Sequence, residues 1–141
     1  MDYKFLVRRY TEEVWNNGNL DLIMEYVAPE YKIHYPGDRY PLGPEGEMKL
    51  VSEIRNAFPD FLVLIDEILQ EGEIVAVRWH AQGTHLGMLR CIPGTGFRLS
   101  WTGMNFLKLE HGKMLESLWN ADHLGQLQQM HLVASEELAH I

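Results

Sequence analysis

The sequence lacks the features that would place it at once in a special class. Its 141 residues contain a single cysteine, Cys91, so no disulfide bond can form within the chain. A lone cysteine fits a reducing compartment, and we therefore predict a cytoplasmic protein. No apolar run reaches the length of about eighteen residues that a membrane span needs, and the N-terminal segment is too charged for a signal peptide. We expect neither a membrane partner nor a secreted protein.

Basic residues are also scarce, since 12 Lys and Arg face 20 Asp and Glu and give a formal net charge of -8. Nucleic-acid binding needs a basic face, so we exclude that class of partner. The seven histidines do not show metal-ligand spacing, because there is no His-x-x-x-His pair and no cysteine pair. Residues 94–96 read Gly-Thr-Gly but lack the lysine of a phosphate loop. The sequence therefore predicts no bound metal and no cofactor.

Helical periodicity is present in the first part of the chain. The first predicted helix carries apolar residues at helical spacing, namely Tyr3, Leu6, Val7, Tyr10 and Val14. The Asn- and Gly-rich residues 16–19 end it. A second, short helix is predicted over residues 20–27, before Pro29, and a third opens at Gly43-Pro44-Glu45 and stops at Pro59.

Strand patterns dominate the rest. A short alternating stretch over residues 31–35 comes between the second and third helices, and four longer strand candidates follow over residues 61–70, 73–84, 97–110 and 113–121. Helices first and antiparallel strands afterwards predict an α+β domain with the helices packed on one face of the sheet. A sheet of this size twists and curls, so its concave side forms a cone that can hold a ligand. We expect one domain over residues 1–132 and a detachable tail over 133–141.

Five stretches in this order are similar to a known family. They are the stretches 57–60 (AFPD), 71–79 (EGEIVAVRW), 83–87 (GTHLG), 92–96 (IPGTG) and 122–129 (DHLGQLQQ). Together they resemble the SnoaL-like polyketide cyclases, a branch of the NTF2-like cone fold. The resemblance implies that fold and, as a reaction class, the cofactor-free intramolecular aldol cyclisation of a polyketide-like ester.

The resemblance also implies that Asp122, just before the last helix, is the acid–base residue, supported by a histidine for which His85 and His34 are our candidates. The residue pattern leaves a second interpretation open, in which Asp122 caps the helix by accepting from the backbone N–H groups of Leu124 or Gly125. A carboxylate fully engaged in capping makes a poor base. If Asp122 is the base, we expect its side chain to lie in the pocket.

Strand alternation nominates the residues that would bind substrate. On the strand over 113–121 we place Leu118, Asn120 and Asp122 toward the cone, and on the preceding strand Trp101 and Asn105. His34 and Tyr31, on the short strand, complete the predicted substrate-binding set. We expect His123 to point into solvent and His80 to be exposed.

These residues predict acid–base chemistry on a small apolar molecule that contains a carbonyl group. Two rival hypotheses stay open: an isomerase or dehydratase that acts on a steroid-like enone, and a non-catalytic ligand-binding or dimerisation module. A pocket plugged by the protein's own side chains would favour the module. We also predict a homodimer through the outer face of the sheet, where we place Leu115, Trp119 and Ala121 as an apolar patch.

Overall fold

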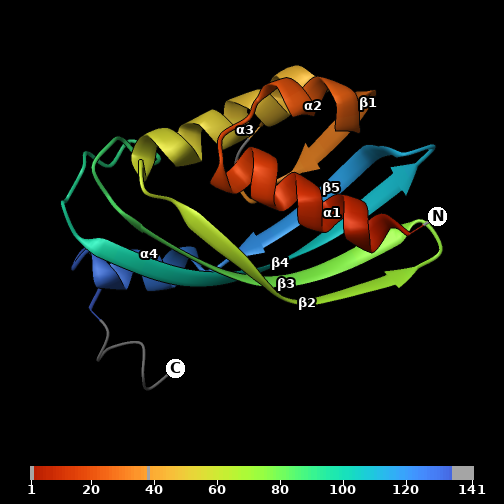
Figure 1. Cartoon of the computed structure of the whole chain (residues 1–141). Coiled ribbons are helices and arrows are strands. Elements are labelled where there is room, and N and C mark those ends of the chain that lie inside the picture. The colour runs from red at the N-terminus through yellow and green to blue at the C-terminus, as the bar shows by residue number, and fades with distance from the viewer. Residues whose placement is uncertain (1, 38, 135–141) are drawn as a thin grey trace.

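Three helical segments lie across the concave side of a curved five-stranded sheet (Figure 1). The computed structural model describes residues 2–37 and 39–134. The helices of the concave side are α1 (Tyr3–Tyr10), α2 (Asp21–Tyr26) and α3 (Pro44–Ala57), and the strands are β1 (Val27–His34), β2 (Leu62–Glu71), β3 (Ile74–Thr84), β4 (Arg98–Glu110) and β5 (Lys113–Ala121). The predicted α+β cone of NTF2-like type is confirmed. Most of the predicted tail, residues 135–141, lies outside the described part of the chain.

The sheet is mainly antiparallel, as predicted, with the strand order β1-β5-β4-β3-β2. Its one parallel pair is β1 with β5, in which Lys32 lies beside Glu116 and His34 beside Leu118. This pair joins an early segment of the chain to a late one at the edge of the sheet. A short helix, α4 (His123–Gln129), follows β5 and contacts β4.

Local sequence explains where the helices begin. Asp2 caps α1, since its side chain accepts from the backbone N–H groups of Lys4 and Phe5. Pro44 stands in the first turn of α3, where its missing N–H costs nothing. The first helix differs from the prediction in one respect, because α1 passes into a π-helical segment, η1 (Thr11–Asn16), rather than continuing as one α-helix.

The core lies between the helices and the concave face of the sheet. Strand β4 alternates strictly, with Leu99, Trp101, Asn105 and Leu107 buried against the helices, as the sequence predicts. The helices contribute buried apolar side chains from α1, η1 and α3, among them Val7, Val14, Leu50 and Val51.

In the second half of β5, the side chains that face the core are the ones that the sequence pattern placed outside, and the reverse. Lys108 pairs with Glu116 but Leu109 pairs with Met114, so Leu115 is an extra residue that forms a β-bulge. The bulge reverses the alternation, because it inserts one residue between Met114 and the rest of the strand. Ser117 is therefore buried and Trp119 faces the core, whereas Leu118 is 45% exposed.

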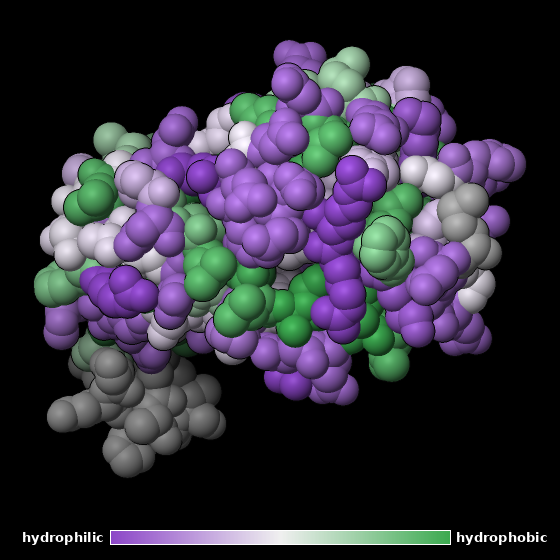
Figure 2. Space-filling view, in the orientation of Figure 1, coloured by the Kyte–Doolittle hydropathy of each residue, from purple (hydrophilic) through white to green (hydrophobic). Residues whose placement is uncertain are grey.

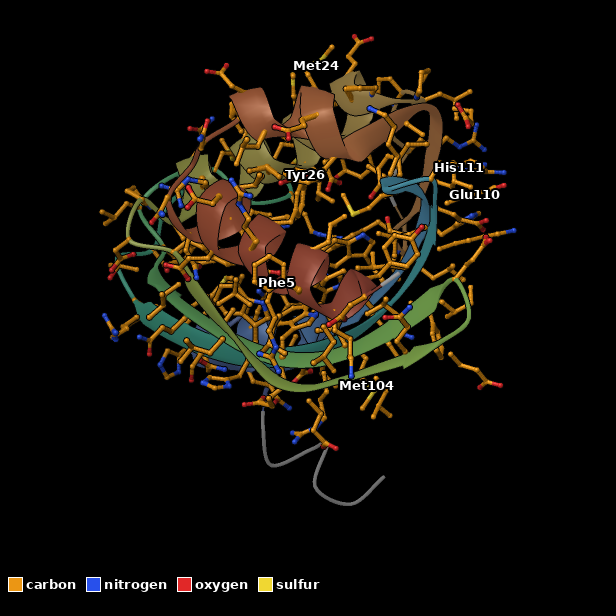
Figure 3. The ribbon with its side chains drawn as sticks, turned by 45° about the vertical axis from the view of Figure 1, so that its right-hand side comes forward. Phe5, Met24, Tyr26, Met104, Glu110 and His111 are labelled. Atoms are coloured by element: carbon orange, nitrogen blue, oxygen red, sulfur yellow. The ribbon has the colours of Figure 1, made fainter. Side chains whose placement is uncertain are left out.

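The outer face of the sheet carries an apolar groove of about 780 Å³. In Figure 3, Met104 lies on the side of the sheet away from the helices. Phe106 pairs with Leu118 across β4 and β5, and both are exposed, as is Leu69. The predicted outer patch of Leu115, Trp119 and Ala121 is wrong for Trp119 and Ala121, which both pack against the core. Within the described residues, no helix is long and apolar enough to cross a membrane.

Candidate functional site

A cavity of about 80 Å³ lies between the helices and the concave face of the sheet. The protein's four tryptophans, Trp15, Trp79, Trp101 and Trp119, belong to its lining. The polar side chains of the lining are Tyr10, Thr11, Tyr35, Glu47, Arg90, Asn105, His123 and Gln126. Apolar walls with a few converging polar groups are typical of a small-molecule site. The helical layer above it presents mostly hydrophilic side chains to solvent (Figure 2).

Trp119 is the centre of the aromatic wall. Its ring centroid lies 5.5 Å from that of Trp15, 5.8 Å from that of Tyr35 and 6.3 Å from that of Trp79. Aromatic rings at such separations pack favourably in tilted or edge-to-face arrangements. These contacts hold the wall in place.

Asn105 is a polar side chain on the buried face of β4. Its Oδ1 atom accepts a hydrogen bond from the indole N–H of Trp79 at 2.7 Å. A Cβ atom at Gly103 would collide with the Trp79 ring, so glycine at this position lets the indole lie against β4. The sequence predicts that Asn105 needs a partner or a ligand, and the structure gives it the partner Trp79.

At its partly exposed end the cavity is lined by Tyr35, Arg90 and His123. The Tyr35 hydroxyl and the Nε2 atom of His123 form a hydrogen bond of 3.0 Å, and their rings are 5.5 Å apart. The Arg90 guanidinium lies over the Tyr35 ring at 5.1 Å. The expectation that His123 points into solvent is wrong, because its ring packs on Tyr35 and lines the cavity.

A buried carboxyl group, Glu47, lies at the helical side of the cavity. Its Oε2 atom accepts from the Tyr10 hydroxyl at 2.6 Å and its Oε1 atom from the Tyr31 hydroxyl at 3.0 Å. Burial raises the pKa of Glu47, and the hydrogen bonds from the two tyrosines oppose that rise. Burial and the charge of Glu47 raise the pKa of Tyr10 and the pKa of Tyr31 well above the usual value for tyrosine, so both hydroxyl groups stay protonated.

Sequence reasoning missed Glu47, although a signal was present. Glu47 shares the helical spacing of the buried stripe of α3, with Leu50, Val51 and Ile54 at the following positions of the same face. An acid at a position that the periodicity assigns to the core needs a partner or a function.

Asp122 lies outside the cavity lining. It is the N-cap of α4, its Oδ1 atom accepts from the backbone N–H of Gly125 at 2.8 Å, and its side chain is exposed. The expectation that its carboxylate lies in the pocket is therefore wrong. The reason is the capping geometry, which turns the side chain toward the first turn of the helix.

His85 is buried but does not line the cavity. Its Nδ1 atom hydrogen-bonds the Thr95 hydroxyl at 3.0 Å and accepts from the Thr95 backbone N–H at 3.3 Å, and its ring packs beside that of Phe58. His85 therefore ties the start of the loop between β3 and β4 to its end. The structure does not bring it to Asp122.

The other predicted residues divide between the two faces of the sheet. Trp101 and Asn105 line the cavity, as predicted. Tyr31 is buried behind the lining, where it contacts Glu47. Leu118 and Asn120 lie in the outer groove because of the bulge in β5, and His34 lies there too, with its Nε2 atom 2.8 Å from Glu116. The placement of these three in the cone is wrong. His80 is exposed, as predicted, and contacts Asp66.

Within residues 2–37 and 39–134, no three His, Cys, Asp or Glu side chains come together in a way that would hold a metal ion. The cavity lining supplies a carboxyl, an imidazole and phenols. Groups of these kinds take up and release protons and donate hydrogen bonds to a carbonyl oxygen.

Comparison with known proteins identifies the family. The family model described as SnoaL-like polyketide cyclase matches residues 5–130. The chain belongs to the SnoaL-like polyketide cyclase family. It is 30% identical to aklanonic acid methyl ester cyclase DnrD of Streptomyces peucetius over 131 residues, which cover 89% of this chain and 88% of the relative. The same identity and share of this chain hold for the cyclase DauD of Streptomyces sp. strain C5, of which 79% is covered.

Solved structures of family members support the same assignment. A protein from Acidithiobacillus ferrooxidans superposes with a TM-score of 0.82 at 29% identity, covering 93% of this chain and 95% of that one. Wild-type IdmH from Streptomyces antibioticus superposes with a TM-score of 0.78 at 28% identity, covering 93% and 99%. Both are named as proposed polyketide cyclases. The predicted resemblance to SnoaL-like cyclases is confirmed.

Proposed function

We propose that the protein catalyses a cofactor-free acid–base reaction, the intramolecular aldol cyclisation of a small, apolar, carbonyl-containing polyketide ester. The observation that carries the proposal is the cavity: apolar walls surround a carboxyl, an imidazole and phenol groups in a member of a cyclase family. In such a reaction, a base removes a proton next to a carbonyl, and the enolate carbon attacks a second carbonyl of the same molecule. General acid–base catalysis contributes roughly 10²–10⁴-fold to such steps.

The family resemblance assigns the acid–base role to Asp122, and this assignment stays part of the proposal. For Asp122 to reach a substrate, its carboxylate must leave the N–H of Gly125 and turn toward the end of the cavity that the next residue, His123, lines. Trp101 and Asn105 are the predicted binding residues that remain in place for an apolar substrate. His85 acts in this proposal through the β3–β4 loop, whose two ends it joins.

Direct assay tests the proposed reaction. Purified protein is incubated with aklanonic acid methyl ester, the compound in the names of both relatives, and the cyclised product is separated by chromatography and identified by mass and NMR spectra. We expect turnover by the wild-type protein without added metal or cofactor. Absence of turnover in the presence of a folded protein would reject this ester as the substrate.

The size of the cavity favours a second candidate, a non-catalytic ligand-binding module. A cavity of about 80 Å³ is smaller than the roughly 150 Å³ that hold a benzene molecule in an engineered site. The four tryptophans line this small cavity, and narrowing of the pocket by the protein's own side chains is what this hypothesis predicts. Ligand binding without turnover, measured by tryptophan fluorescence, would support the module.

The third hypothesis, an isomerase or dehydratase acting on an enone, is favoured by one contact. A carboxyl that receives two tyrosine hydroxyl groups resembles the acid–phenol arrangement that such chemistry uses, although it forms at Glu47 and not at Asp122. Conversion of a steroid-like enone in place of the ester would distinguish this reaction from cyclisation.

We further propose a homodimer that forms through the outer face of the sheet, with a second copy of this chain as the partner. The groove there exposes Met104, Phe106 and Leu118 side by side on β4 and β5, and an exposed apolar patch of this kind marks an interaction surface. Because the patch runs along the sheet, two copies can present the same residues to each other across a two-fold axis.

A further inference from the structure

Glu47 on α3 receives its side-chain hydrogen bonds from residues of two other elements. Tyr10 comes from α1 and Tyr31 from β1, whereas Glu47 stands in the first turn of α3. Its side chain is almost completely buried, with 2% of the residue exposed. Burial of a carboxyl group is unfavourable unless partners compensate for it, so an apolar residue would stabilise the core more simply.

The hydrogen bonds of the cluster have a direction. The indole N–H of Trp119 can only donate, and it donates to Ser117 Oγ at 3.0 Å. Ser117 can then donate to the Tyr31 hydroxyl, 2.6 Å away, and Tyr31 donates to Glu47 Oε1. Tyr10 donates to the other oxygen. The donors thus point toward the carboxyl group, as suits a carboxylate that accepts protons.

Glu47 also has access to the cavity. Glu47 and Tyr10 belong to the cavity lining, whereas Tyr31 and Ser117 lie behind it. Each carboxylate oxygen offers two lone-pair directions, and the tyrosines occupy one on each oxygen. The remaining directions can meet a molecule in the cavity. Among the described residues, Tyr10 and Tyr31 are the titratable groups that contact this carboxyl group.

We propose that Glu47 performs, from the helical side of the cavity, the acid–base step that the family resemblance assigns to Asp122, and that Tyr10 orients its carboxylate toward the substrate. This inference rests on the proposed function. Glu47 takes a proton from the carbon next to a substrate carbonyl: the C–H bond breaks, an O–H bond forms on Glu47, and the electron pair moves to the enolate oxygen. The enolate carbon then forms a C–C bond to a second carbonyl carbon, and Glu47 returns the proton to the resulting alkoxide. Atoms and charge balance without a co-reactant.

Deuterium exchange tests the proton transfer itself. In D₂O, the wild-type protein should exchange the protons between the two carbonyls of methyl acetoacetate, a minimal dicarbonyl probe, faster than buffer does. We expect Glu47→Gln to lower that protein-dependent rate by roughly 100-fold or more at a similar melting temperature. Wild-type exchange no faster than buffer, or full exchange activity in Glu47→Gln, would overturn the proposal.

Glu53→Gln is the matched control. Glu53 lies on the same helix and also accepts from a tyrosine hydroxyl, that of Tyr40 at 2.9 Å, but it is exposed and outside the cavity lining. We expect this variant to exchange the probe at the wild-type rate. An equal loss in both variants would mean that any loss of acid on α3 disturbs the protein, and it would overturn the specific role of Glu47.

A second variant covers the case in which Glu47→Gln does not fold. The hydrogen bond from Tyr10 lowers the pKa of Glu47, so Tyr10→Phe should raise that pKa and move the acid limb of the exchange–pH profile to higher pH. A purely structural contact would change the amount of folded protein and leave the limb in place. An unmoved limb in folded Tyr10→Phe would therefore overturn the proposal.

The two proposals can fail separately. Exchange that depends on Glu47, without cyclisation of aklanonic acid methyl ester, would reject the cyclisation and retain Glu47 as an acid–base group. Cyclisation of the ester that survives Glu47→Gln would retain the proposed function and reject Glu47.

Discussion

The carboxylate of Asp122 accepts a hydrogen bond of 2.8 Å from the backbone N–H of Gly125, and this contact starts the last helix. We expect Asp122→Ala to lower the free energy of unfolding by about 1 kcal/mol, because the cap is lost, and Asp122→Asn to retain most of it, because an amide also caps. Thermal unfolding measures the first effect. Turnover of aklanonic acid methyl ester by Asp122→Asn tests the acid–base role. A loss of roughly 100-fold supports Asp122 as a base, and full activity leaves it only the capping role.

The same contact depends on glycine at position 125, where a Cβ atom would collide with the Asp122 carboxylate. In the wild-type protein, Gly125→Ala should therefore lower stability, since it displaces the cap. In Asp122→Ala the collision is gone, and the same substitution should stabilise α4 by up to about 1 kcal/mol through helix propensity. A double-mutant cycle by chemical denaturation gives the coupling. Equal effects in both backgrounds would contradict the steric argument.

Gly103→Ala should destabilise the aromatic wall. The added methyl group would meet the ring of Trp79, which must then move and strain its hydrogen bond to Asn105. We expect the free energy of unfolding to fall by roughly 1–3 kcal/mol. Thr102→Ala, at the neighbouring exposed position of the same strand, is the control. A Gly103→Ala protein as stable as the control would show that the Trp79 ring moves aside at no cost, which would contradict this prediction.

The buried carboxyl group should make stability depend on pH in an unusual direction. Because the pKa of Glu47 in the folded protein is raised from its ordinary 4.5, the folded state holds this proton more tightly than the unfolded state does. Its contribution to stability is fully present below pH 4.5 and is lost as the pH rises through the folded pKa. Glu47→Gln should lack this loss. Denaturation curves across this pH range, compared with Glu53→Gln, test the sign.

The outer groove predicts the residues on which association depends. Phe106→Glu places a charge in the groove, and we expect it to convert a dimer to a monomer in sedimentation velocity experiments at micromolar concentration. Phe5→Glu is the control, since Phe5 is also exposed but lies on α1, on the helical side of the molecule (Figure 3). A monomeric wild-type protein would reject the dimer.

Sequence patterns predicted the fold well because its signals are local. The helical spacing of residues 3–14 and the alternation of β4 each follow from one element alone, and both are found in the structure. Which side chains of β5 face the core could not be predicted in this way. The bulge at Leu115 forms through pairing with β4, and the sequence of β5 alone does not predict that pairing. Because of the bulge, Leu118 and Asn120 lie outside the predicted site.

The candidate site was predicted only in part, for a related reason. Trp101 and Asn105 lie on a regular strand, so alternation located them. Glu47 was hidden because its partners, Tyr10 and Tyr31, come from two other elements, and only the assembled fold brings their hydroxyl groups to one carboxyl group. The capping pattern at Asp122 was visible in the sequence, and the structure favours it over the pocket position.

The parallel pairing of β1 with β5 has a consequence for synthesis of the chain. Tyr31 and Ser117, which meet at this edge, are 86 residues apart, so the ribosome has released most of the chain before they can meet. Until β5 emerges, Trp15 and Trp79 lack the ring of Trp119 between them. A nascent chain that stalls before residue 113 therefore presents an unfinished aromatic wall, the kind of surface that chaperones cover and that aggregates when they do not.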